Sequence, residues 1–354
     1  MSIKTVLNAS YPRTEFVAKL YSKFLSGKIA SDEFEKGIEE AITDLFKFLK
    51  KVGINIFTDG MFRWDDIFNP LIRYVEGVKI NGLMRFYDNN FFFRAPIIES
   101  KLRLSNEHPF REWFKKSLDL AKKVFGNSEI LLKQPLPGPL TLALNSVNNH
   151  YGDLSTLISD WRSEVLEPLI KDLSTVGLSA VEIHEPSLVW KGTSDELRKL
   201  GIKELAYLID YASKIGIDVW LLTYFGSLRK LKELVTEVSR AILGLDFYSS
   251  ERGRVQLVIR DYGLKRVMLG VLNARNTLME RPENVRRAIF KALDYGAKEI
   301  YVGNNAPLDF IPEVIASKKL RRLSKIIMKL RGGNNELEQN RASYTSYYGH
   351  RFVP

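Results

Sequence analysis

Short runs of apolar residues alternate with longer segments of amphipathic spacing along the whole chain. The run Val219-Trp220-Leu221-Leu222 is typical of a strand in a sheet that helices cover. Eight such runs predict strands over Thr5–Asn8, Asn55–Thr58, Glu129–Lys133, Ala180–Ile183, Asp218–Thr223, Ile242–Asp246, Arg266–Leu272 and Glu299–Val302. The segments between them predict helices over Asp32–Val52, Pro109–Val124, Leu154–Val176, Ser194–Ile215, Ser227–Arg240, Ser250–Tyr262, Arg281–Tyr295 and Ile311–Arg331. This alternation predicts an α/β fold, a single (β/α)₈ barrel of the TIM type over residues 1–331.

One segment interrupts the alternation, because residues 69–100 are long and rich in aromatic side chains. Phe86-Tyr87 and Phe91-Phe92-Phe93 flank Asp88-Asn89-Asn90, a composition typical of a β-hairpin turn. We therefore expect a hairpin inserted after the second strand, as a lid over the barrel mouth or as a dimer arm. Plain packing against the barrel is the alternative. Residues 332–354 form a polar, Tyr-rich C-terminal tail rather than a domain.

The composition is globular, with 45% hydrophobic and 27% charged residues. The formal net charge of +11 is spread along the chain, apart from a dense basic patch near the C-terminus. This distribution favours solubility and attraction of anionic ligands over nucleic-acid binding. The chain has no run of eighteen apolar residues, no leader-like apolar stretch at its N-terminus and no cysteine. We therefore expect a cytoplasmic protein without a membrane span or disulfides.

The predicted helix Ile311–Arg331 has two distinct faces. Its apolar stripe consists of Leu320, Leu323, Ile327 and Leu330. Its basic face consists of Lys318, Arg322, Lys325 and Lys329. A solvated surface is the simplest interpretation of the basic face. The alternative is a docking surface for an acidic partner or for an anionic tail on a cofactor.

Polar residues follow the predicted strands where a barrel of this kind carries its active site, at the carboxyl ends of the strands. In chain order they are Asn8, Ser10, Asp59, Gln134, His184, Glu185, Thr223, Tyr224, Asp246, Asn273, Arg275, Asn304 and Asn305. We expect these side chains to converge on one mouth. The chain has no Walker loop, GxGxxG, GxSxG elbow or kinase signature, so nucleotide hydrolysis, dinucleotide oxidoreduction and serine hydrolysis are disfavoured.

Two constellations at this mouth carry candidate chemistry. His184 and Glu185 are a catalytic acid and base, a direct ligand contact, or, with Asp246, metal ligands. The structural alternative is a loop ion pair for Glu185 and a hydrogen bond for His184. Asp59 and Trp64 would bind a planar heterocycle, with the ring of Trp64 stacking on it and Asp59 accepting from its ring N–H donors. The alternative there is a simple ion pair between Arg63 and Asp66.

Several stretches together carry a resemblance to a known family. The most specific are Asn8–Pro12, Pro135–Leu142, Ile183–Leu188 and Asn305–Pro312. Supporting stretches are Asp59–Asp66, Gly82–Asn90, Thr223–Gly226, Gly244–Asp246 and Asn273–Asn276. In this order, over residues 3–325, the chain resembles the cobalamin-independent methionine synthase family. The similarity is closest to its N-terminal-type barrel and to free-standing archaeal proteins of that type.

Enzymes of that family activate homocysteine on a zinc ion held by one His, two Cys and one Glu. The resemblance places Ser10 where a serine binds the homocysteine carboxylate, and His184 where an aspartate binds its amino group. It places Thr223–Gly226 at the family's His-x-Cys pair, Asp246 near the zinc glutamate and Ala306 at the last zinc cysteine. Because the chain has no cysteine, we expect no zinc and no tightly bound cofactor.

The leading hypothesis is a protein of methionine biosynthesis that assists methyl transfer to homocysteine from a reduced pterin (folate) or another carrier. It would act beside a zinc-bearing catalytic barrel, and it could form a homo-oligomer through residues 69–100. One alternative is a stand-alone one-carbon or sulfur enzyme that uses His184 and Glu185 with no metal or a different one. Another is a structural partner without a ligand. The expected substrate-binding residues are Ser10, Asp59, Trp64, Tyr224, Asp246, Arg275 and Asn305.

Overall fold

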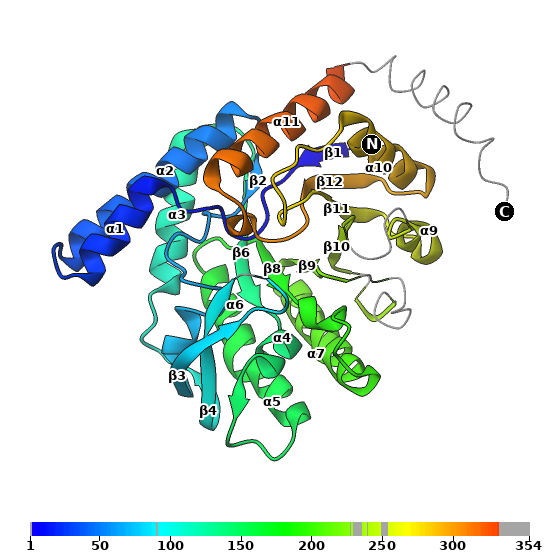
Figure 1. Ribbon diagram of the computed structural model, residues 1–354. Coiled ribbons are helices and arrows are strands. Elements are labelled where there is room, and N and C mark those ends of the chain that lie inside the picture. The colour runs from blue at the N-terminus through cyan, green and yellow to red at the C-terminus, as the bar shows by residue number, and fades with distance from the viewer. Residues whose placement is uncertain are drawn as a thin grey trace.

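The computed structural model describes residues 2–89, 91–226, 228, 236–238, 240–248 and 254–332 of the 354-residue chain. A seven-stranded parallel sheet forms most of a barrel (Figure 1). Its order is β1 (Ser2–Thr5), β12 (Glu299–Asn304), β11 (Arg266–Leu272), β10 (Ile242–Asp246), β9 (Asp218–Leu222), β8 (Ala180–His184) and β6 (Gln134–Pro137).

Two short strands close the ring. β2 (Ile56–Phe57) pairs in parallel with β5 (Leu131–Leu132), and a bridge between Val6 and Ile56 joins β2 to the end of β1. Only Lys133 separates β5 from β6, so these two act as one strand with an interruption. Counted in this way, eight strand positions complete the barrel, and the predicted fold class is confirmed.

The third predicted strand ends too early. The structure continues it as β6, whose residues pair with β8 from Gln134 opposite Val181 to Pro137 opposite His184. Gln134 therefore lies within a strand, and its predicted position beyond a strand end is wrong. Two prolines, which lack the N–H that a ladder uses, made this stretch look like a loop.

Helices flank the barrel strands (Figure 1). Predicted ones are α2 (Ser31–Lys51), α3 (Phe110–Phe125), α7 (Asp195–Lys214), α9 (Leu257–Tyr262), α10 (Pro282–Asp294) and α11 (Glu313–Gly332). The single helix predicted over Leu154–Val176 consists of α5 (Leu154–Asp160), the π-helical turn η2 (Trp161–Leu166) and α6 (Glu167–Ser174). The predicted helix Ser227–Arg240 and the tail 332–354 fall largely outside the described residues.

Three elements have no counterpart among the predictions: α1 (Glu15–Leu25), α4 (Pro139–Leu144) and the short strand β7 (Val147–Asn148). The side chain of Thr14 caps α1 by accepting a hydrogen bond from the backbone N–H of Val17. Three-residue 3₁₀ turns η3 (Pro186–Leu188) and η5 (Leu308–Phe310) follow β8 and β12. A longer turn, η1 (Leu71–Tyr74), leads into the inserted segment.

Aromatic packing fixes the two-residue strand β2 to its helices. Phe57 of β2 is fully buried, with its ring centroid 5.0 Å from that of Phe46 on α2 and 5.0 Å from that of Phe125 on α3. Each buried aromatic side chain of this kind contributes about 1.5–3 kcal/mol through removal of apolar surface from water. Side-chain packing thus compensates for the few backbone hydrogen bonds of β2.

Helix α11 has the two faces expected from its spacing. Leu320, Leu323, Ile327 and Leu330 are buried, and the four residues of the basic face are exposed. Between these faces, Lys319 is buried, and its ammonium group donates a hydrogen bond of 2.6 Å to the carboxylate of Glu280. None of the described helices combines the length and apolar character that crossing a membrane requires.

The inserted segment is an antiparallel hairpin of β3 (Val75–Arg85) and β4 (Phe92–Leu104), with β7 beside β4. It is the cyan pair at the lower left of Figure 1. At its tip, the guanidinium of Arg275 lies 3.1 Å from the carboxylate of Asp88, and the hydroxyls of Tyr87 and Ser187 lie 2.6 Å apart. Because Ser187 and Arg275 follow the carboxyl ends of β8 and β11, the tip covers the barrel mouth as a lid. Asn90 of the turn lies outside the described residues.

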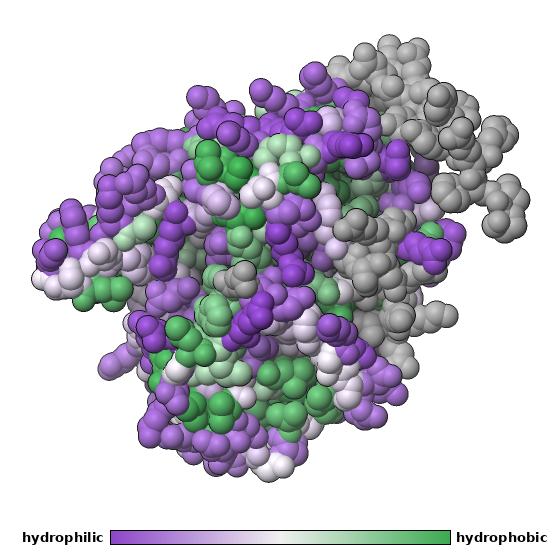
Figure 2. All heavy atoms as spheres, in the orientation of Figure 1, coloured by the Kyte–Doolittle hydropathy of each residue, from purple (hydrophilic) through white to green (hydrophobic). Residues whose placement is uncertain are grey.

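Several large apolar side chains on the hairpin face solvent. Leu83, Met84 and Phe92 are 65%, 41% and 53% exposed, and Val147 of the adjoining β7 is 43% exposed. Green apolar surface lies over the hairpin in Figure 2, among the purple hydrophilic surface that covers much of this face. These residues form an exposed patch, which we call the hairpin patch.

Candidate functional site

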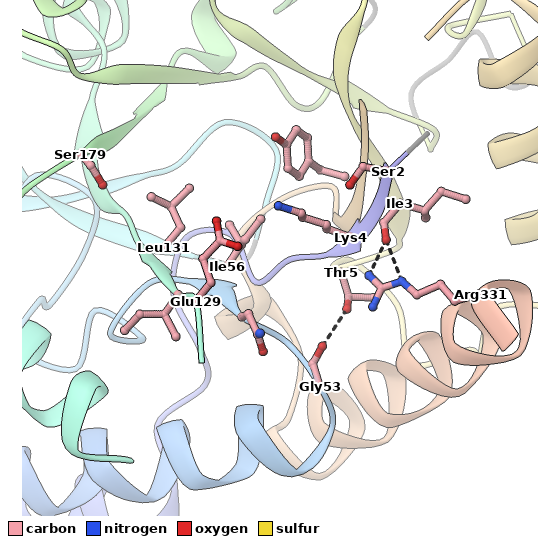
Figure 3. Close-up of a pocket in the computed structure, with 13 residues that line it drawn as sticks. Ser2, Ile3, Lys4, Thr5, Gly53, Ile56, Glu129, Leu131, Ser179 and Arg331 are labelled. Carbon is pink, nitrogen blue, oxygen red and sulfur yellow. Dashed lines mark hydrogen bonds between the residues drawn. The ribbon is translucent and has the colours of Figure 1, made fainter. Parts of the chain in front are cut away.

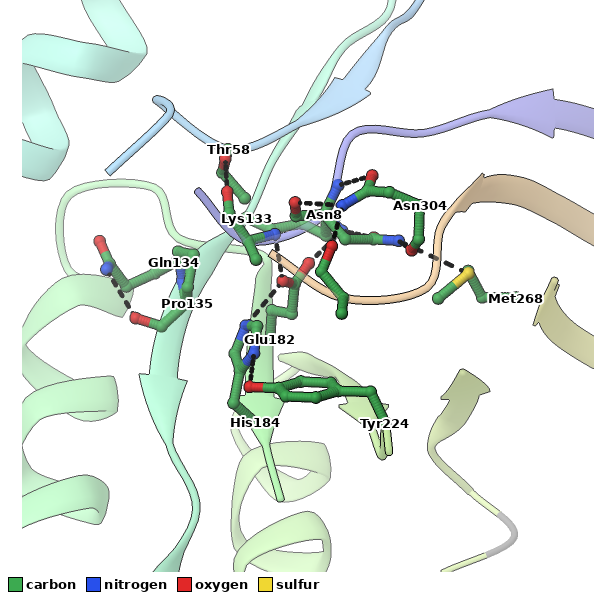
Figure 4. Close-up of polar contacts among 12 residues, drawn as sticks. Asn8, Thr58, Lys133, Gln134, Pro135, Glu182, His184, Tyr224, Met268 and Asn304 are labelled. Carbon is green, nitrogen blue, oxygen red and sulfur yellow. Dashed lines mark hydrogen bonds and ion pairs between the residues drawn. The ribbon is translucent and has the colours of Figure 1, made fainter. Parts of the chain in front are cut away.

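A chain of buried polar side chains crosses the interior of the barrel (Figure 4). Because side chains alternate along a strand, Glu182 and His184 of β8 both point into the barrel. The carboxylate of Glu182 forms an ion pair with the ammonium of Lys133 and accepts a hydrogen bond of 2.6 Å from the backbone N–H of Ala9. The Nε2 atom of His184 lies 2.8 Å from the same carboxylate. None of these three side chains is exposed.

The charges in this chain fix which atoms carry protons. Burial alone would raise the pKa of Glu182, but the ammonium of Lys133 and the hydrogen bond with His184 outweigh it and hold the pKa at about 2. An ionised carboxylate only accepts hydrogen bonds, so Nε2 of His184 carries a proton and donates it. Nδ1 of His184 lies 3.2 Å from the hydroxyl of Tyr224, which can donate a hydrogen bond to Nδ1 when that nitrogen carries no proton. Burial raises the pKa of Tyr224 well above its ordinary value, so the phenol remains protonated.

Glu185 faces a different part of the fold. Its carboxylate accepts hydrogen bonds from the backbone N–H of Leu140 at 3.1 Å and of Thr141 at 2.6 Å, at the N-terminus of α4, and from the hydroxyl of Thr141. A Cβ atom on Gly138 would lie 2.2 Å from this carboxylate, so only glycine fits there. Burial raises the pKa of Glu185 to about 8, against the opposing effect of these hydrogen bonds. The side chain is completely buried and holds α4 against the end of β8.

Asp246 and Asn305 are brought together at the mouth. The amide of Asn305 donates to Asp246 at 2.8 Å, and the other Asp246 oxygen accepts from the backbone N–H of Phe225 at 3.1 Å. The Asn305 oxygen accepts from the backbone N–H of Ala274. The pair therefore connects the loops after β9, β10, β11 and β12. Arg275 lies above them, with its guanidinium 4.9 Å from the ring centroid of Phe225.

Asp59 and Trp64 lie on the other side of the mouth. The carboxylate of Asp59 accepts a hydrogen bond of 3.1 Å from the hydroxyl of Ser117 on α3. The predicted alternative, an ion pair between Arg63 and Asp66, is wrong. Arg63 pairs instead with Glu35 at 3.1 Å, and Asp66 accepts hydrogen bonds from the backbone N–H groups of its own loop and of β4.

A cavity of about 220 Å³ opens at the mouth beneath the hairpin. Three predicted residues line it, Ser10, Trp64 and Tyr224. Residues that were not predicted as site residues also line it, notably Arg13, Phe86, Phe91, Asp309 and Phe310. His184, Glu185, Asp59, Asp246, Asn305 and Arg275 do not line this cavity, although all six are near the strand ends. His184 reaches it through the hydroxyl of Tyr224.

Two polar atoms at this cavity make no hydrogen bond of good geometry to a described residue, although their side chains are close neighbours. They are the hydroxyl oxygen of Ser10, whose side chain is buried, and one carboxylate oxygen of Asp309. Burial raises the pKa of Asp309 to about 6, while the neighbouring Ser10 hydroxyl and Arg13 guanidinium act in the opposite direction. Buried polar groups in proteins are normally hydrogen-bonded, so these two mark a place for a ligand group or water.

A larger hollow of about 720 Å³ lies at the opposite end of the barrel (Figure 3). Lys4 and Thr5 of β1, Glu129 before β5, and Arg331 of α11 line it. The guanidinium of Arg331 donates to the backbone carbonyl of Ile3 at 2.8 Å. Because active sites of (β/α)₈ barrels lie at the carboxyl ends of the strands, the active site is expected at the mouth rather than here.

The residues at the mouth do not fit a zinc ion. Thiolates are absent from the whole sequence, and no three His, Asp or Glu side chains are grouped as metal ligands among the described residues. Asp246 is already used by Asn305 and backbone N–H groups, and Ala306 offers no ligand atom. His184 is bound on both ring nitrogens, beside the Lys133–Glu182 ion pair.

Comparisons with known proteins agree over nearly the whole chain. The profile of a family described as "Cobalamin-independent synthase, N-terminal domain" matches residues 73–292. A methionine synthase of Pyrococcus furiosus is 24% identical, over 95% of this chain and 94% of its own. One of Sulfolobus acidocaldarius is 22% identical, over 91% of each chain.

Solved structures show the same fold. A B12-independent methionine synthase from Shewanella sp. W3-18-1, in complex with selenomethionine, superposes with a TM-score of 0.73 at 20% identity. The alignment covers 93% of this chain and 98% of that one. A putative vitamin-B12 independent methionine synthase from Listeria monocytogenes gives a TM-score of 0.70 at 18% identity, over 93% and 99% of the two chains.

Proposed function

The chain belongs to the cobalamin-independent methionine synthase family, and from that premise we propose that it assists methyl transfer to homocysteine in methionine biosynthesis. In this proposal it binds the methyl donor at the barrel mouth, and a separate zinc-bearing barrel binds and activates homocysteine. The ligands available to each barrel are the reason for assigning donor binding to this chain and homocysteine activation to the other. Thiol activation on zinc needs ligands that this chain lacks, whereas its mouth still offers a cavity lined by aromatic and polar side chains.

The mouth cavity is the observation that carries the proposal. The Ser10 hydroxyl and an Asp309 oxygen are buried there without partners, aromatic rings line much of the wall, and the hairpin tip lies above. Ligand sites combine an apolar wall with a few polar groups in this way. A reduced pterin is one candidate donor and another methyl carrier is the other.

Reconstitution tests the companion role directly. Methionine formation would be measured with this chain alone, with a zinc-bearing barrel of the same organism alone, and with both. We expect little turnover by this chain alone and a higher rate in the mixture. A Ser10→Ala variant should stimulate less, whereas Asp119→Asn, an exposed residue of α3, should stimulate as the unmodified chain does. Efficient methylation of homocysteine by the isolated chain, or no effect on the zinc barrel, would overturn the proposal.

The Glu182–His184–Tyr224 chain favours a second candidate, a stand-alone enzyme that needs no zinc. In it, the Tyr224 hydroxyl accepts a proton from a ligand in the cavity while it gives its own proton to Nδ1 of His184, so the phenol stays protonated and the imidazole is the base. Glu185 would act only indirectly, because its carboxylate is bound to α4. Turnover by the isolated chain that His184→Asn abolishes, with an unchanged melting temperature, would select this candidate.

A further inference from the structure

Aromatic side chains make up much of the wall of the mouth cavity. Trp64, Phe86, Phe91, Tyr224 and Phe310 all line it. The ring centroids of Phe91 and Phe310 lie 5.3 Å apart in an edge-to-face arrangement, and those of Phe86 and Phe91 lie 6.3 Å apart. The faces of aromatic rings carry partial negative charge and attract cations.

The charged residues of the cavity are mostly acidic. Asp65, Asp66 and Asp309 line it with Arg13, and Arg73 pairs with Asp65 from outside the lining, so three carboxylates face two guanidiniums, a formal charge of −1. This local charge has the opposite sign to the +11 of the whole chain. An anionic ligand group, such as a phosphate or the glutamate tail of a folate, would therefore be repelled inside the cavity.

Asp309 is the carboxylate available to a ligand. Asp65 is paired with Arg13 at 3.4 Å and with Arg73 at 2.9 Å. Asp66 is surrounded by backbone N–H donors. Asp309 makes no ion pair with any described residue, and its unpartnered oxygen lies at the same cavity as the unpartnered hydroxyl of Ser10.

We infer that the mouth cavity binds a small methylated onium cation, a sulfonium or a quaternary ammonium, with Asp309 as its counter-charge and the aromatic rings as its walls. This deepens the proposed function, because it names a class of methyl-bearing ligand for the same cavity. A primary ammonium fits less well, because Ser10 and Asp309 would accept from its N–H groups but the rings that form much of the remaining wall supply no acceptor. A pterin is disfavoured by size, because the cavity is below the roughly 300–1,000 Å³ of sites for drug-sized ligands.

Binding of simple probes to the full chain tests the inference without homocysteine or a partner. Trimethylsulfonium and tetramethylammonium would be titrated by calorimetry, and the two arms show which onium centre is preferred. Choline would be compared with its neutral analogue, in which carbon replaces the quaternary nitrogen. We expect the cation to bind at least about tenfold more tightly than the neutral analogue, and methylammonium to bind more weakly than tetramethylammonium.

Variants locate the site. Asp309→Asn keeps the size of the side chain and should weaken binding of the preferred cation by about tenfold or more. Phe310→Leu should weaken it as well, whereas Asp119→Asn on the exposed face of α3 should leave it unchanged. Equal affinities for choline and its neutral analogue, or no effect of either cavity substitution, would overturn the inference. Either result leaves the reconstitution assay to decide the companion role, so the two proposals fail separately.

Discussion

Lys133 and Glu182 neutralise each other where neither side chain is exposed. Removing one partner leaves the other charge buried and unpaired. We therefore expect Lys133→Met to lower the free energy of unfolding by about 3–5 kcal/mol, measured by urea denaturation. Lys47→Met is the matched control, because Lys47 pairs with Asp44 on the surface and should cost less than about 1 kcal/mol. Similar losses of unfolding free energy for the two variants would show that the buried pair contributes no more to stability than the surface pair.

The raised pKa of Glu185 makes the free energy of unfolding fall as pH rises, which is the opposite of the usual effect of a carboxylate. Its pKa in the folded protein is about 8, above the value of roughly 4.3 in an unfolded chain. The folded state therefore keeps a proton that the unfolded state releases, so this contribution is complete below about pH 4.3 and is lost as pH rises through about 8.

Glu185→Gln should remove that dependence. The unmodified protein should lose stability relative to the variant between about pH 4.3 and 8, with a slope of at most about 1.4 kcal/mol per pH unit. Urea denaturation at several pH values measures it, with the exposed Glu33→Gln on α2 as control. Parallel curves for the unmodified protein and the Glu185→Gln variant would contradict the raised pKa.

At the scale of single residues, the sequence predicted where the mouth lies better than it predicted which side chains carry the chemistry there. Ser10 and Tyr224 were predicted from strand ends and Trp64 as a stacking ring in the loop after the second strand, and all three line the cavity. Lys133 and Glu182 were missed because they belong to strand segments. The site residues were predicted from positions that follow the strands. Asp309 was missed because it lies in the 3₁₀ turn η5, beyond the eighth strand end. Its place in the stretch Asn305–Pro312, already singled out by resemblance, was the available signal.

At the scale of elements, the Tyr87 hydroxyl is one of several contacts that hold the hairpin tip over the mouth, beside the Arg275–Asp88 ion pair and the packing of aromatic rings. The hydroxyl of Tyr87 bonds with Ser187 at 2.6 Å and accepts a hydrogen bond from Asn145 at 3.3 Å. Tyr87→Phe should cost about 0.5–1.5 kcal/mol and speed amide hydrogen exchange in the tip. Tyr207→Phe, at a half-exposed position on α7, is the control. Unchanged amide hydrogen exchange in the tip would show that the Arg275–Asp88 ion pair and the aromatic packing hold it without the Tyr87 hydroxyl.

The hairpin patch leads us to expect self-association. Its exposed apolar side chains form a surface of the kind that marks interfaces. A Leu83→Ser, Phe92→Ser double variant should shift the mass measured by analytical ultracentrifugation toward the monomer. The exposed pair Lys19 and Glu15 on α1 offers a control site remote from the hairpin. If the unmodified protein and the double variant are both monomers, covering the barrel mouth is the role that remains for the hairpin.

Element boundaries show where the sequence was uninformative. Strand and helix periodicities differ strongly, so the alternation that defines the barrel was visible without knowledge of any contact. Helix α4 was not visible, because six residues are too few for a helical period, and its position depends on the distant carboxylate of Glu185. Tertiary contacts of this kind have no signature in local sequence.

At the scale of the whole molecule, the absence of cysteine sets an expectation for metal content. Purified protein should contain much less than one zinc ion per chain after dialysis against a mild chelator, because no thiolate ligands exist. Elemental analysis measures it, with a zinc-bearing barrel of the family treated in parallel. Stoichiometric zinc that survives this treatment would mean that another ligand set exists.

The pairing of β1 with β12 sets the order in which the barrel can be completed during synthesis. The first strand emerges from the ribosome early, but its neighbour is the last strand, and the Asn8 and Asn304 side chains exchange hydrogen bonds with each other's backbone. Until β12 has been translated, β1 and β11 present unpaired edges that other chains can join. Closure is thus a late event, and nascent chains of this protein are expected to be clients of chaperones that shield sheet edges.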